Sequence, residues 1–513
     1  MNAKWIGLLA GAAAGAVAGG VALGVAELFA AFAGGAQASP LIAVGSAGIT
    51  LTPEWLKEFA IRHFGTNDKL VLLMSLGVGI GILALVIGIV AKRYLKVGLA
   101  GFAAFGVIGA VAAVTRPTGG WTTVIPSIAG CLAGMVALFL LVRDRSYVIT
   151  SENGETSTDT DRRSLLVTGA GAVAVGGVSG LGGELLLKRD NVDSARKAVR
   201  LPRAASLAKP VPKGAQIRLP GMTPFVTPNK DFYRVDTALT LPQISPRDWR
   251  LRIHGMVDHV VELSFDDLLK RPMLERDITL SCVSNQVGGR YAGNARWLGA
   301  SLADLLRQAG VRSGADQILS RSSDGFTIST PIETIMDGRD ALLAVGMNGE
   351  ALPVAHGFPA RMIVPELYGY VSATKWVVDL KVTRFATDKA YWTKRRYADH
   401  APIKTLSRID VPQSFARVKA GRVPVAGTAW AQHRGIDLVE VRIDNGPWRR
   451  AELAPVPGLD TWRQWVLEWD ATPGSHRLEV RATDGTGAVQ PSKRVPVIPD
   501  GATGWHSVVV TVI

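Results

Sequence analysis

Residues 277–297 read DITLSCVSNQVGGRYAGNARW and contain Cys282, one of only two cysteines in the chain. Ile278, Thr279 and Leu280 precede the cysteine and are typical of a short buried strand. Residues 283–293 are rich in Gly, Ser and Asn and predict a loop. A thiolate at such a junction can bind a soft metal or act as a nucleophile, although a lone cysteine is also commonly an inert buried residue.

Composition indicates a protein that is partly embedded in a membrane. The 513 residues are enough for about three domains. A hydrophobic share of 48% with 56 glycines is unusual for a purely soluble protein and fits membrane helices. The net charge is +14, yet no Lys/Arg run is interleaved with aromatic residues, so nucleic acid is not predicted as a partner. Cys131 and Cys282 fall in different segments, so no internal disulfide is expected.

The first 187 residues predict a transmembrane anchor of about five helices. Each apolar stretch is near or above the roughly 18 to 20 residues that a helix needs to cross a bilayer. These stretches are residues 5–33, 70–91, 97–114, 121–142 and 165–187. No histidine lies inside any of them and no Cys-x-x-Cys-His motif occurs, so this half is interpreted as an anchor rather than a cytochrome.

Basic residues in alternate loops predict the orientation of the anchor. They are Lys4, then Lys92, Arg93 and Lys96, then Arg143, Arg145, Arg162 and Arg163. By the positive-inside rule these loops face the cytoplasm, and five crossings leave everything after residue 187 outside. The prediction is therefore a multi-pass protein of a bacterial cytoplasmic membrane with its later domains on the extracytoplasmic side.

Three features of the anchor leave alternatives open. The glycines Gly7, Gly11, Gly15 and Gly19 either let helices approach closely or are spaced by chance. Residues 36–38, AQA, could be a signal-peptidase site that removes the first helix. Arg162 and Arg163 precede the fifth apolar stretch and resemble a twin-arginine export signal, or they are an ordinary cytoplasmic basic pair.

Several ordered motifs resemble the molybdenum-cofactor domain of the sulfite oxidase family. They are SCVSNQVGG, GNARWLGASLADLL, SSDGFTISTP, LLAVGMNGEALPVAHGFPARMIVPELYGY and SATKWV, spread over residues 224–385. The resemblance implies that Cys282 ligates molybdenum beside the dithiolene of a single pterin, giving a molybdenum–molybdopterin cofactor.

The same resemblance implies a set of cofactor-binding residues. Those expected near the pterin, its ring or its phosphate are Phe232, Tyr233, Arg234, Val235, Asp236, Asp324, His356, Arg361, Thr374, Lys375 and Trp376. Cations suit a buried phosphate because charge-assisted hydrogen bonds are strong. Taken one at a time, such cations are commonly surface residues, and Arg234 with Asp236 could be a local surface pair.

Two departures from the family pattern concern the substrate. Val287 stands where sulfite oxidases carry a basic residue, and Val345 stands where they carry a tyrosine. Sulfite is an anion and needs cationic partners in a desolvated pocket. Sulfite oxidation is therefore less expected than oxygen-atom transfer on another small molecule, such as reduction of an S-oxide or N-oxide.

Patterning divides the rest of the chain. Residues 188–223 are charged and Pro-rich and predict a linker, and residues 224–399 alternate short strands and helices, which predicts an α+β fold without a dinucleotide fingerprint. Leu251, Ile253 and Val257 predict a half-buried strand. Ser264 is expected to cap a short helix that reaches Arg271. Ser301 and Asp304 are expected to cap a second helix, which Gly310 ends.

Residues 400–513 contain alternating apolar and polar segments separated by turns such as Asp444-Asn-Gly, which predicts an immunoglobulin-like β-sandwich. The tryptophans expected in its core are Trp430, Trp448, Trp462, Trp465 and Trp469. The resemblance implies that this domain forms a homodimer.

The whole sequence thus predicts a membrane-anchored molybdopterin-dependent oxidoreductase that acts on a small molecule and exchanges electrons with a quinone, haem or flavin protein. The alternative from another class is an anchored adhesion or scaffold protein that kept the fold and lost the chemistry.

Overall fold

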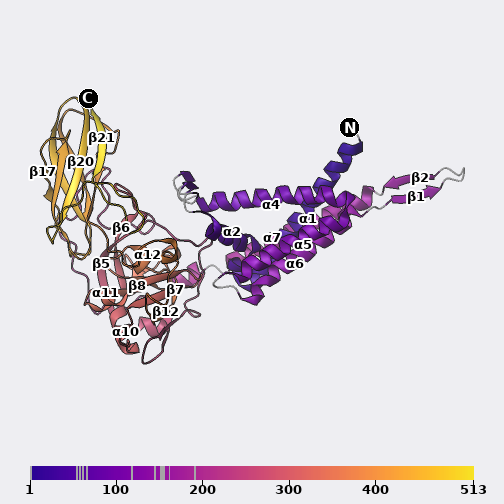
Figure 1. The fold of residues 1–513 in the computed structure, drawn as a ribbon, viewed down its shortest axis with the longest axis horizontal. Coiled ribbons are helices and arrows are strands. Elements are labelled where there is room, and N and C mark those ends of the chain that lie inside the picture. Colours follow the sequence, from indigo (N-terminus) through magenta and orange to yellow (C-terminus); the bar gives the residue numbers. More distant parts are fainter. Residues whose placement is uncertain are drawn as a thin grey trace. The chain divides into compact units, whose positions relative to one another are not determined.

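The computed structural model describes residues 3–53, 56, 59–60, 63–64, 68–116, 120–143, 146–150, 156–160, 162–189 and 192–513 (Figure 1). Contacts divide the chain into two compact units. One comprises the described residues of Met1–Asn191 together with Ala238–Gln243, and the other comprises Val192–Thr237 and Ile244–Ile513. Arg145 and Asp161, which belong to the predicted cytoplasmic loops, lie outside the described residues.

The first unit is a bundle of long apolar helices. They are α1 (Ala3–Ala33), α2 (Pro40–Leu51), α4 (Asp68–Arg93), α5 (Leu95–Val114), α6 (Ile125–Val142) and α7 (Arg162–Arg189), with short 3-10 turns η1 (Gly35–Ala38) and η3 (Trp121–Val124) and a hairpin of β1 (Ser146–Thr150) and β2 (Thr156–Thr160). Helix α1 packs against α4, α6 and α7. A Cβ on Gly15 would lie 2.0 Å from the Ala84 carbonyl oxygen of α4, so this glycine permits the close approach.

Four of these helices are long and apolar enough to cross a membrane. Their spans are Gly7–Ala33, Lys69–Arg93, Leu95–Val114 and Trp121–Val142. In α7 the apolar part is Val167–Gly183, which is shorter, so the fifth crossing stays a prediction. Helix α2 lies between the first two predicted crossings and was not predicted; Ser39 caps it and Pro40 begins it.

The second unit begins with a β-rich domain built on two five-stranded sheets. One sheet has the order β10-β9-β6-β5, with β11 also pairing β9, and the other has the order β4-β3-β12-β7-β8. The strands are β3 (Arg250–Gly255), β4 (Val261–Ser264), β5 (Met273–Ser281), β6 (Ala292–Ser301), β7 (Gln317–Ser322), β8 (Thr327–Pro331), β9 (Leu342–Met347), β10 (Glu350–Ala351), β11 (Arg361–Ile363) and β12 (Val377–Thr383). Only β12 and β3 pair in parallel among these named strands, so the β-rich sheets with short helices fit the α+β prediction.

Short helices and turns complete this domain. They are α8 (Asp193–Ala198), α9 (Phe265–Leu269), α10 (Leu302–Ala309), α11 (Ile332–Met336), α12 (Gly369–Ser372), η4 (Val354–His356) and η5 (Thr393–Arg395). Ser264 and Asp267 form a capping box on α9, which ends at Leu269 rather than at Arg271 as predicted. Ser301 caps α10, and Gly310 ends it with φ 69°, as predicted.

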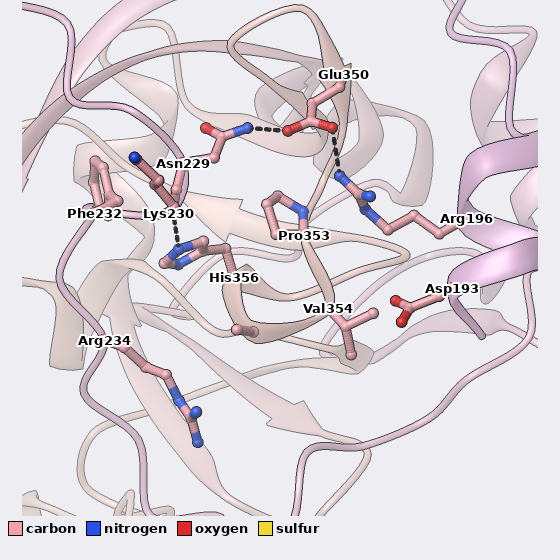
Figure 2. Close-up of a pocket in the computed structure, with 11 residues that line it drawn as sticks. Asp193, Arg196, Asn229, Lys230, Phe232, Arg234, Glu350, Pro353, Val354 and His356 are labelled. Atoms are coloured by element: carbon pink, nitrogen blue, oxygen red, sulfur yellow. Dashed lines mark hydrogen bonds and ion pairs between the residues drawn. The ribbon is translucent and has the colours of Figure 1, made fainter. Parts of the chain in front are cut away.

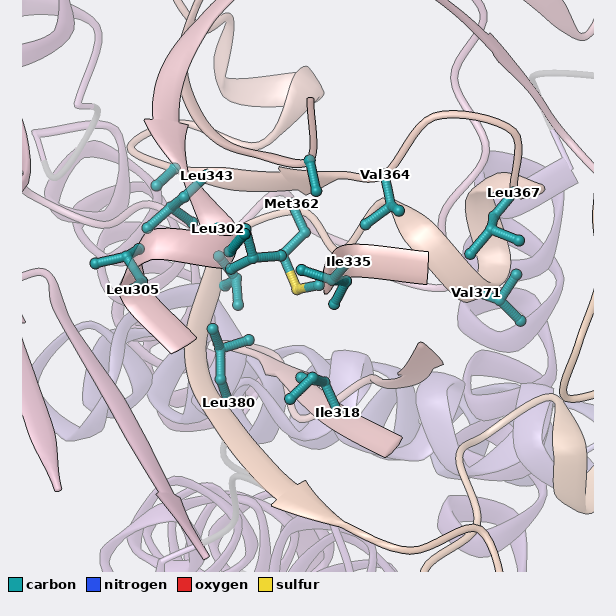
Figure 3. Close-up of a cluster of buried hydrophobic side chains, with 14 of the residues drawn as sticks. Leu302, Leu305, Ile318, Ile335, Leu343, Met362, Val364, Leu367, Val371 and Leu380 are labelled. Atoms are coloured by element: carbon teal, nitrogen blue, oxygen red, sulfur yellow. The ribbon is translucent and has the colours of Figure 1, made fainter. Parts of the chain in front are cut away.

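A continuous hydrophobic core fixes the two sheets and the helices between them. Figure 3 shows Leu302 and Leu305 of α10 and Ile335 of α11 beside Ile318 of β7 and Leu380 of β12. All five side chains are fully buried. The prediction of a half-buried strand holds for Leu251 and Ile253 of β3, whereas Val257 lies beyond the end of β3 and forms an isolated bridge to Val311.

The C-terminal residues form two further sheets. Their orders are β13-β15-β19-β18 and β14-β21-β20-β16-β17. The strands are β13 (Leu406–Val411), β14 (Arg417–Val418), β15 (Gly421–Trp430), β16 (Ile436–Ile443), β17 (Arg449–Arg450), β18 (Glu452–Leu453), β19 (Arg463–Ala471), β20 (Gly474–Asp484) and β21 (His506–Val512). Val425 and Trp465 from the first sheet share one core with Val480 and Val510 from the second. The immunoglobulin-like assignment stays a prediction.

The five tryptophans do not share one environment. Trp465 and Trp469 lie in the core between the C-terminal sheets. Trp430 and Trp462 are buried in the core of the preceding domain, where the Trp462 indole Nε1 donates to the Phe225 carbonyl oxygen at 2.8 Å. The predicted place in the C-terminal core is therefore wrong for Trp430 and Trp462, and also for Trp448, which is half-buried and packs on Trp505 with ring centroids 4.9 Å apart. The two domains therefore share buried side chains.

Candidate active site

Cys282 lies one residue beyond the end of β5, at the predicted strand–loop junction. Its backbone N–H donates to the Tyr291 carbonyl oxygen at 2.8 Å, and its own carbonyl oxygen accepts from Asn285 N–H at 3.0 Å. The side chain is buried. Burial raises the pKa of the thiol, and this rise exceeds the opposing effect of hydrogen bonds from Ser284 and of the Lys375 charge. A bound metal cation would be needed to hold the sulfur as a thiolate at neutral pH.

The loop after Cys282 is held from the C-terminal domain. The Arg408 guanidinium donates to the Gly289 carbonyl oxygen at 2.7 Å. Gly288 has φ +78°, and a Cβ there would lie 2.2 Å from the His506 ring. Sequence reasoning missed both Arg408 and His506, because each lies more than a hundred residues beyond the loop and no local pattern marks it.

Aromatic side chains pack beside the cysteine. Phe232 stacks on Tyr233 with ring centroids 5.2 Å apart and meets the edges of Trp297 and His356 at 5.7 and 5.5 Å. Burial raises the pKa of the Tyr233 hydroxyl, so this group stays protonated and remains a hydrogen-bond donor. By contrast, Val235 is exposed.

Arg361 is a buried cation whose polar atoms are incompletely paired. Arg361 is only 5% exposed to solvent. The two terminal nitrogens donate to the carbonyl oxygens of His356 at 3.1 Å and Ala373 at 3.4 Å, while Nε has no partner. Burial lowers the pKa of Arg361 to about 10. Within the described ranges no carboxylate forms an ion pair with it, so the position suits an anionic ligand.

Two further cations share one carboxylate. Asp236 Oδ2 lies 2.9 Å from Lys375 Nζ and 2.8 Å from Arg234 Nε. The Asp236 side chain is 4% exposed and that of Lys375 12%, whereas that of Arg234 is 40% exposed, so the carboxylate joins a buried cation to a cation at the surface. Burial lowers the pKa of Lys375 to about 8, against the opposing effect of Asp236. The cluster keeps one positive charge in excess when Lys375 is protonated.

His356 lies near the charges of Arg361 and Lys375 and also lines a cavity. Its Nε2 lies 3.0 Å from the Asn229 carbonyl oxygen, so Nε2 carries the proton. Burial and the nearby charges of Arg361 and Lys375 lower its pKa to about 4, which leaves the ring neutral at physiological pH. His356, Phe232 and Arg234 line this cavity (Figure 2). Its volume is about 470 Å³.

Comparison with known proteins gives these features a family context. Residues 238–392 match the oxidoreductase molybdopterin binding domain family. The uncharacterized oxidoreductase YuiH of Bacillus subtilis is 32% identical over 149 residues, which are 29% of this chain and 72% of that protein. The chain belongs to the sulfite oxidase family. It is an oxidoreductase that takes a molybdenum cofactor.

Longer relatives match a larger part of the chain. Mouse mitochondrial sulfite oxidase is 30% identical over 343 residues, which are 56% of this chain and 62% of the relative. The chain thus spans about three fifths of the length of the curated sulfite oxidase that it matches. The structure of the sulfane dehydrogenase SoxCD of Paracoccus pantotrophus covers 55% of this chain and 80% of its own, with 26% identity and a TM-score of 0.48.

The residues present fit a molybdenum cofactor whose remaining ligands are organic. Among the described residues, no three His, Cys, Asp or Glu side chains converge on a metal position, so Cys282 is the donor that this site offers. A single soft thiolate suits a metal that a dithiolene already holds. The unpartnered Arg361 Nε and the unpartnered, buried Asn285 Nδ2 are donors that an anionic, polar cofactor can satisfy.

Three residues of this chain that the resemblance places near the cofactor form hydrogen bonds with other protein groups. Thr374 Oγ1 lies 2.6 Å from Ser320 Oγ in the core, and Trp376 Nε1 donates to the Val354 carbonyl oxygen at 2.8 Å. Asp324 accepts from Phe326 N–H at 3.1 Å in the turn between β7 and β8. Their cofactor contacts stay predictions, as do those of the clustered residues.

The cavity also has walls that sequence reasoning missed. Asp193 and Arg196 of α8, Asn229 and Lys230, and Glu350 of β10 line it. Helix α8 falls in the stretch predicted as a linker. That stretch continues along β5, where Ala205 N–H donates to the Met273 carbonyl oxygen at 2.8 Å.

Proposed function

We propose that this chain is a membrane-anchored molybdopterin oxidoreductase in which Cys282 is the protein ligand to molybdenum beside a single pterin. The observation that carries the proposal is the pairing of one buried thiol with an anion-binding cluster. Arg361, Lys375 and Arg234 supply positive charge, and Asp236 is the carboxylate that the described structure places among them. Soft metal ligation and phosphate binding are the two demands that such a cofactor makes.

The bound cofactor supplies two-electron redox chemistry coupled to oxygen-atom transfer. The chain supplies binding, orientation and electrostatics. Arg361 and Lys375 bind the anionic part of the cofactor, and Phe232 with Tyr233 covers it and limits access of water. Neutral His356 donates its Nε2–H to the Asn229 carbonyl oxygen, so its Nδ1 is left to accept a hydrogen bond.

We propose that sulfite is not the best substrate. Val345 is fully buried within the hydrophobic core, and Val287 is half-buried in the loop after Cys282. Neither side chain can pair with an anion, and Arg290 is the only cation in that loop, residues 282–291. An S-oxide or N-oxide needs less positive charge than sulfite does, which favours reduction of such a neutral substrate. Efficient sulfite oxidation by the loaded enzyme with an artificial acceptor would contradict this choice.

The anchor supports a place at the membrane. The described helices include four of membrane-spanning length. The second of these spans ends in two basic residues, Lys92 and Arg93. We propose that the catalytic domain lies on the extracytoplasmic side of a bacterial cytoplasmic membrane and reaches it folded, through the twin-arginine route. The electron partner would be a quinone, haem or flavin protein, and the C-terminal sheets would form an immunoglobulin-like domain that pairs two copies.

Metal analysis of the full-length protein tests the proposal. Protein purified in detergent from cells competent to make the cofactor should contain molybdenum and show the visible absorption of a molybdenum–thiolate bond. Cys282→Ser should lose that absorption and the activity. The control is Cys131→Ser, which removes the other cysteine, in α6, and should keep both. A parent protein without molybdenum would refute the proposed function.

A further inference from the structure

Helix α8 contributes to the wall of the cavity beside His356, although it belongs to the stretch predicted as a linker after the anchor. Helix α7 ends at Arg189 and α8 begins at Asp193. Asp193 and Arg196 both line the cavity (Figure 2). We propose that α8 is a strap that retains the cofactor in its pocket. The inference rests on the proposed function, because it takes the cavity to be the cofactor's.

One guanidinium attaches the strap to the catalytic domain. Arg196 Nε donates to the Leu352 carbonyl oxygen at 2.8 Å, and a terminal nitrogen donates to the Ala351 carbonyl oxygen at 2.9 Å. The same nitrogen lies 2.7 Å from Glu350 Oε2. The Arg196 side chain is 15% exposed, against 53% for Glu350. The exposed ion pair alone would contribute little, but the two carbonyl acceptors fix the geometry of a largely buried cation.

The attachment continues by hydrogen bonds to the site histidine. The second Glu350 oxygen accepts from Asn229 Nδ2 at 2.6 Å. Asn229 in turn presents its backbone carbonyl oxygen to His356 Nε2 at 3.0 Å, and its side-chain oxygen accepts from Asn348 Nδ2 at 2.8 Å. Figure 2 shows this path from Arg196 through Glu350 and Asn229 to His356. The strap therefore bonds directly to residues 350–352 and, through Glu350 and Asn229, is linked to His356.

This arrangement has a consequence for cofactor exchange. A cofactor that leaves past α8 must first break the three hydrogen bonds of Arg196, so those bonds slow its release. Conversely, a ligand that occupies the cavity stabilises the docked α8, because it binds only that arrangement. Retention of the cofactor then depends on the segment that directly follows the last helix of the anchor.

The test compares Arg196→Ala with Arg307→Ala in full-length protein loaded in cells. Arg307 is a control for the loss of an arginine ion pair alone, because its pair with Asp304 at 2.6 Å on α10 is exposed and Arg307 does not line the cavity. Molybdenum that remains with the protein is measured over time after dilution and gel filtration. We expect Arg196→Ala to lose molybdenum at least about tenfold faster than the parent, the factor that one charged hydrogen bond at the low end of its range contributes. Arg307→Ala should match the parent.

Trypsin supplies a second readout that does not depend on the rate of release. Arg196 and Lys197 are cleavage sites within α8, and Lys197 remains in Arg196→Ala. Loaded parent should resist cleavage at these sites, whereas parent made in cofactor-deficient cells should be cut faster. Equal cleavage of the loaded and empty parent, or equal molybdenum loss from Arg196→Ala and Arg307→Ala, would overturn the strap. A parent that never contains molybdenum would instead refute the proposed function, so the two failures are distinguishable.

Discussion

Replacing Arg361 by Met should separate the stability of the empty fold from that of the loaded enzyme. Burial lowers the pKa of Arg361 from 12.5 to about 10. A lowered pKa on a cation means that the folded protein disfavours the charged form, and the penalty is present at every pH below about 10. At about 1.4 kcal/mol per pH unit, a shift from 12.5 to about 10 costs the empty fold about 3 kcal/mol at neutral pH.

The guanidinium also contributes two hydrogen bonds, to the carbonyl oxygens of His356 and Ala373. Each bond from a charged donor contributes about 1.5 to 3 kcal/mol, and the 3.4 Å bond lies at or below the low end. Losing both therefore costs about 3 kcal/mol, which offsets the relief of the buried charge. Arg361→Met should change the stability of the empty protein by less than about 1 kcal/mol, but it removes the charge that an anionic cofactor would pair with.

The assay is thermal unfolding of protein purified from cofactor-competent and cofactor-deficient cells. The parent should melt at a higher temperature when loaded, and Arg361→Met should lose most of this difference. Arg339→Met is the control, because the Arg339 side chain is 6% exposed and its partners are the protein's own Asp337 and Glu366. This change should destabilise both forms by a few kcal/mol. If Arg361→Met behaves like Arg339→Met and keeps the loaded–empty difference, Arg361 does not bind the cofactor.

Three further predictions concern the loop, the C-terminal domain and export. Gly288→Ala should destabilise the protein by a few kcal/mol and reduce activity, because the new Cβ would lie 2.2 Å from the His506 ring. The control is Gly349→Ala, which has a similar φ of +83° but lies in open space and should cost only about 1 kcal/mol. Equal melting temperatures of the two variants would refute this prediction. Burial, Arg408 and Arg494 lower the pKa of His506 to about 4, so its neutral form is favoured by folding and up to about 3 kcal/mol of stability should be lost as pH falls from about 6.5 to 4. His506→Asn retains an acceptor for Ile409 N–H and should flatten that acid dependence in denaturant titrations; an unchanged slope would contradict it. Replacing Arg162 and Arg163 by Lys keeps the charge but removes the twin-arginine feature, so a reporter fused after Ile513 should lose its external signal; export equal to the parent's would make α7 an ordinary anchor.

Local signals in the sequence were enough to predict several elements and the family. A buried strand ending at a Gly-rich loop around Cys282, caps at Ser264 and Ser301, and a left-handed stop at Gly310 all follow from residues within a few positions of one another. Apolar stretches of membrane-spanning length were equally readable, since lipid solvation depends on composition and length. The family likewise followed from motifs that each lie within one short segment.

Long-range packing decided the rest. Lys375 and Asp236 are 139 residues apart, Arg408 and Gly289 are 119 apart, and Arg196 lies 156 positions from its acceptor Leu352. The sequence could name Lys375 and Asp236 through motifs, but Arg196 and Arg408 resemble any other basic residue in their segments. Their roles follow from which carbonyl oxygens the folded chain leaves within reach of a buried guanidinium, and only the tertiary structure determines that.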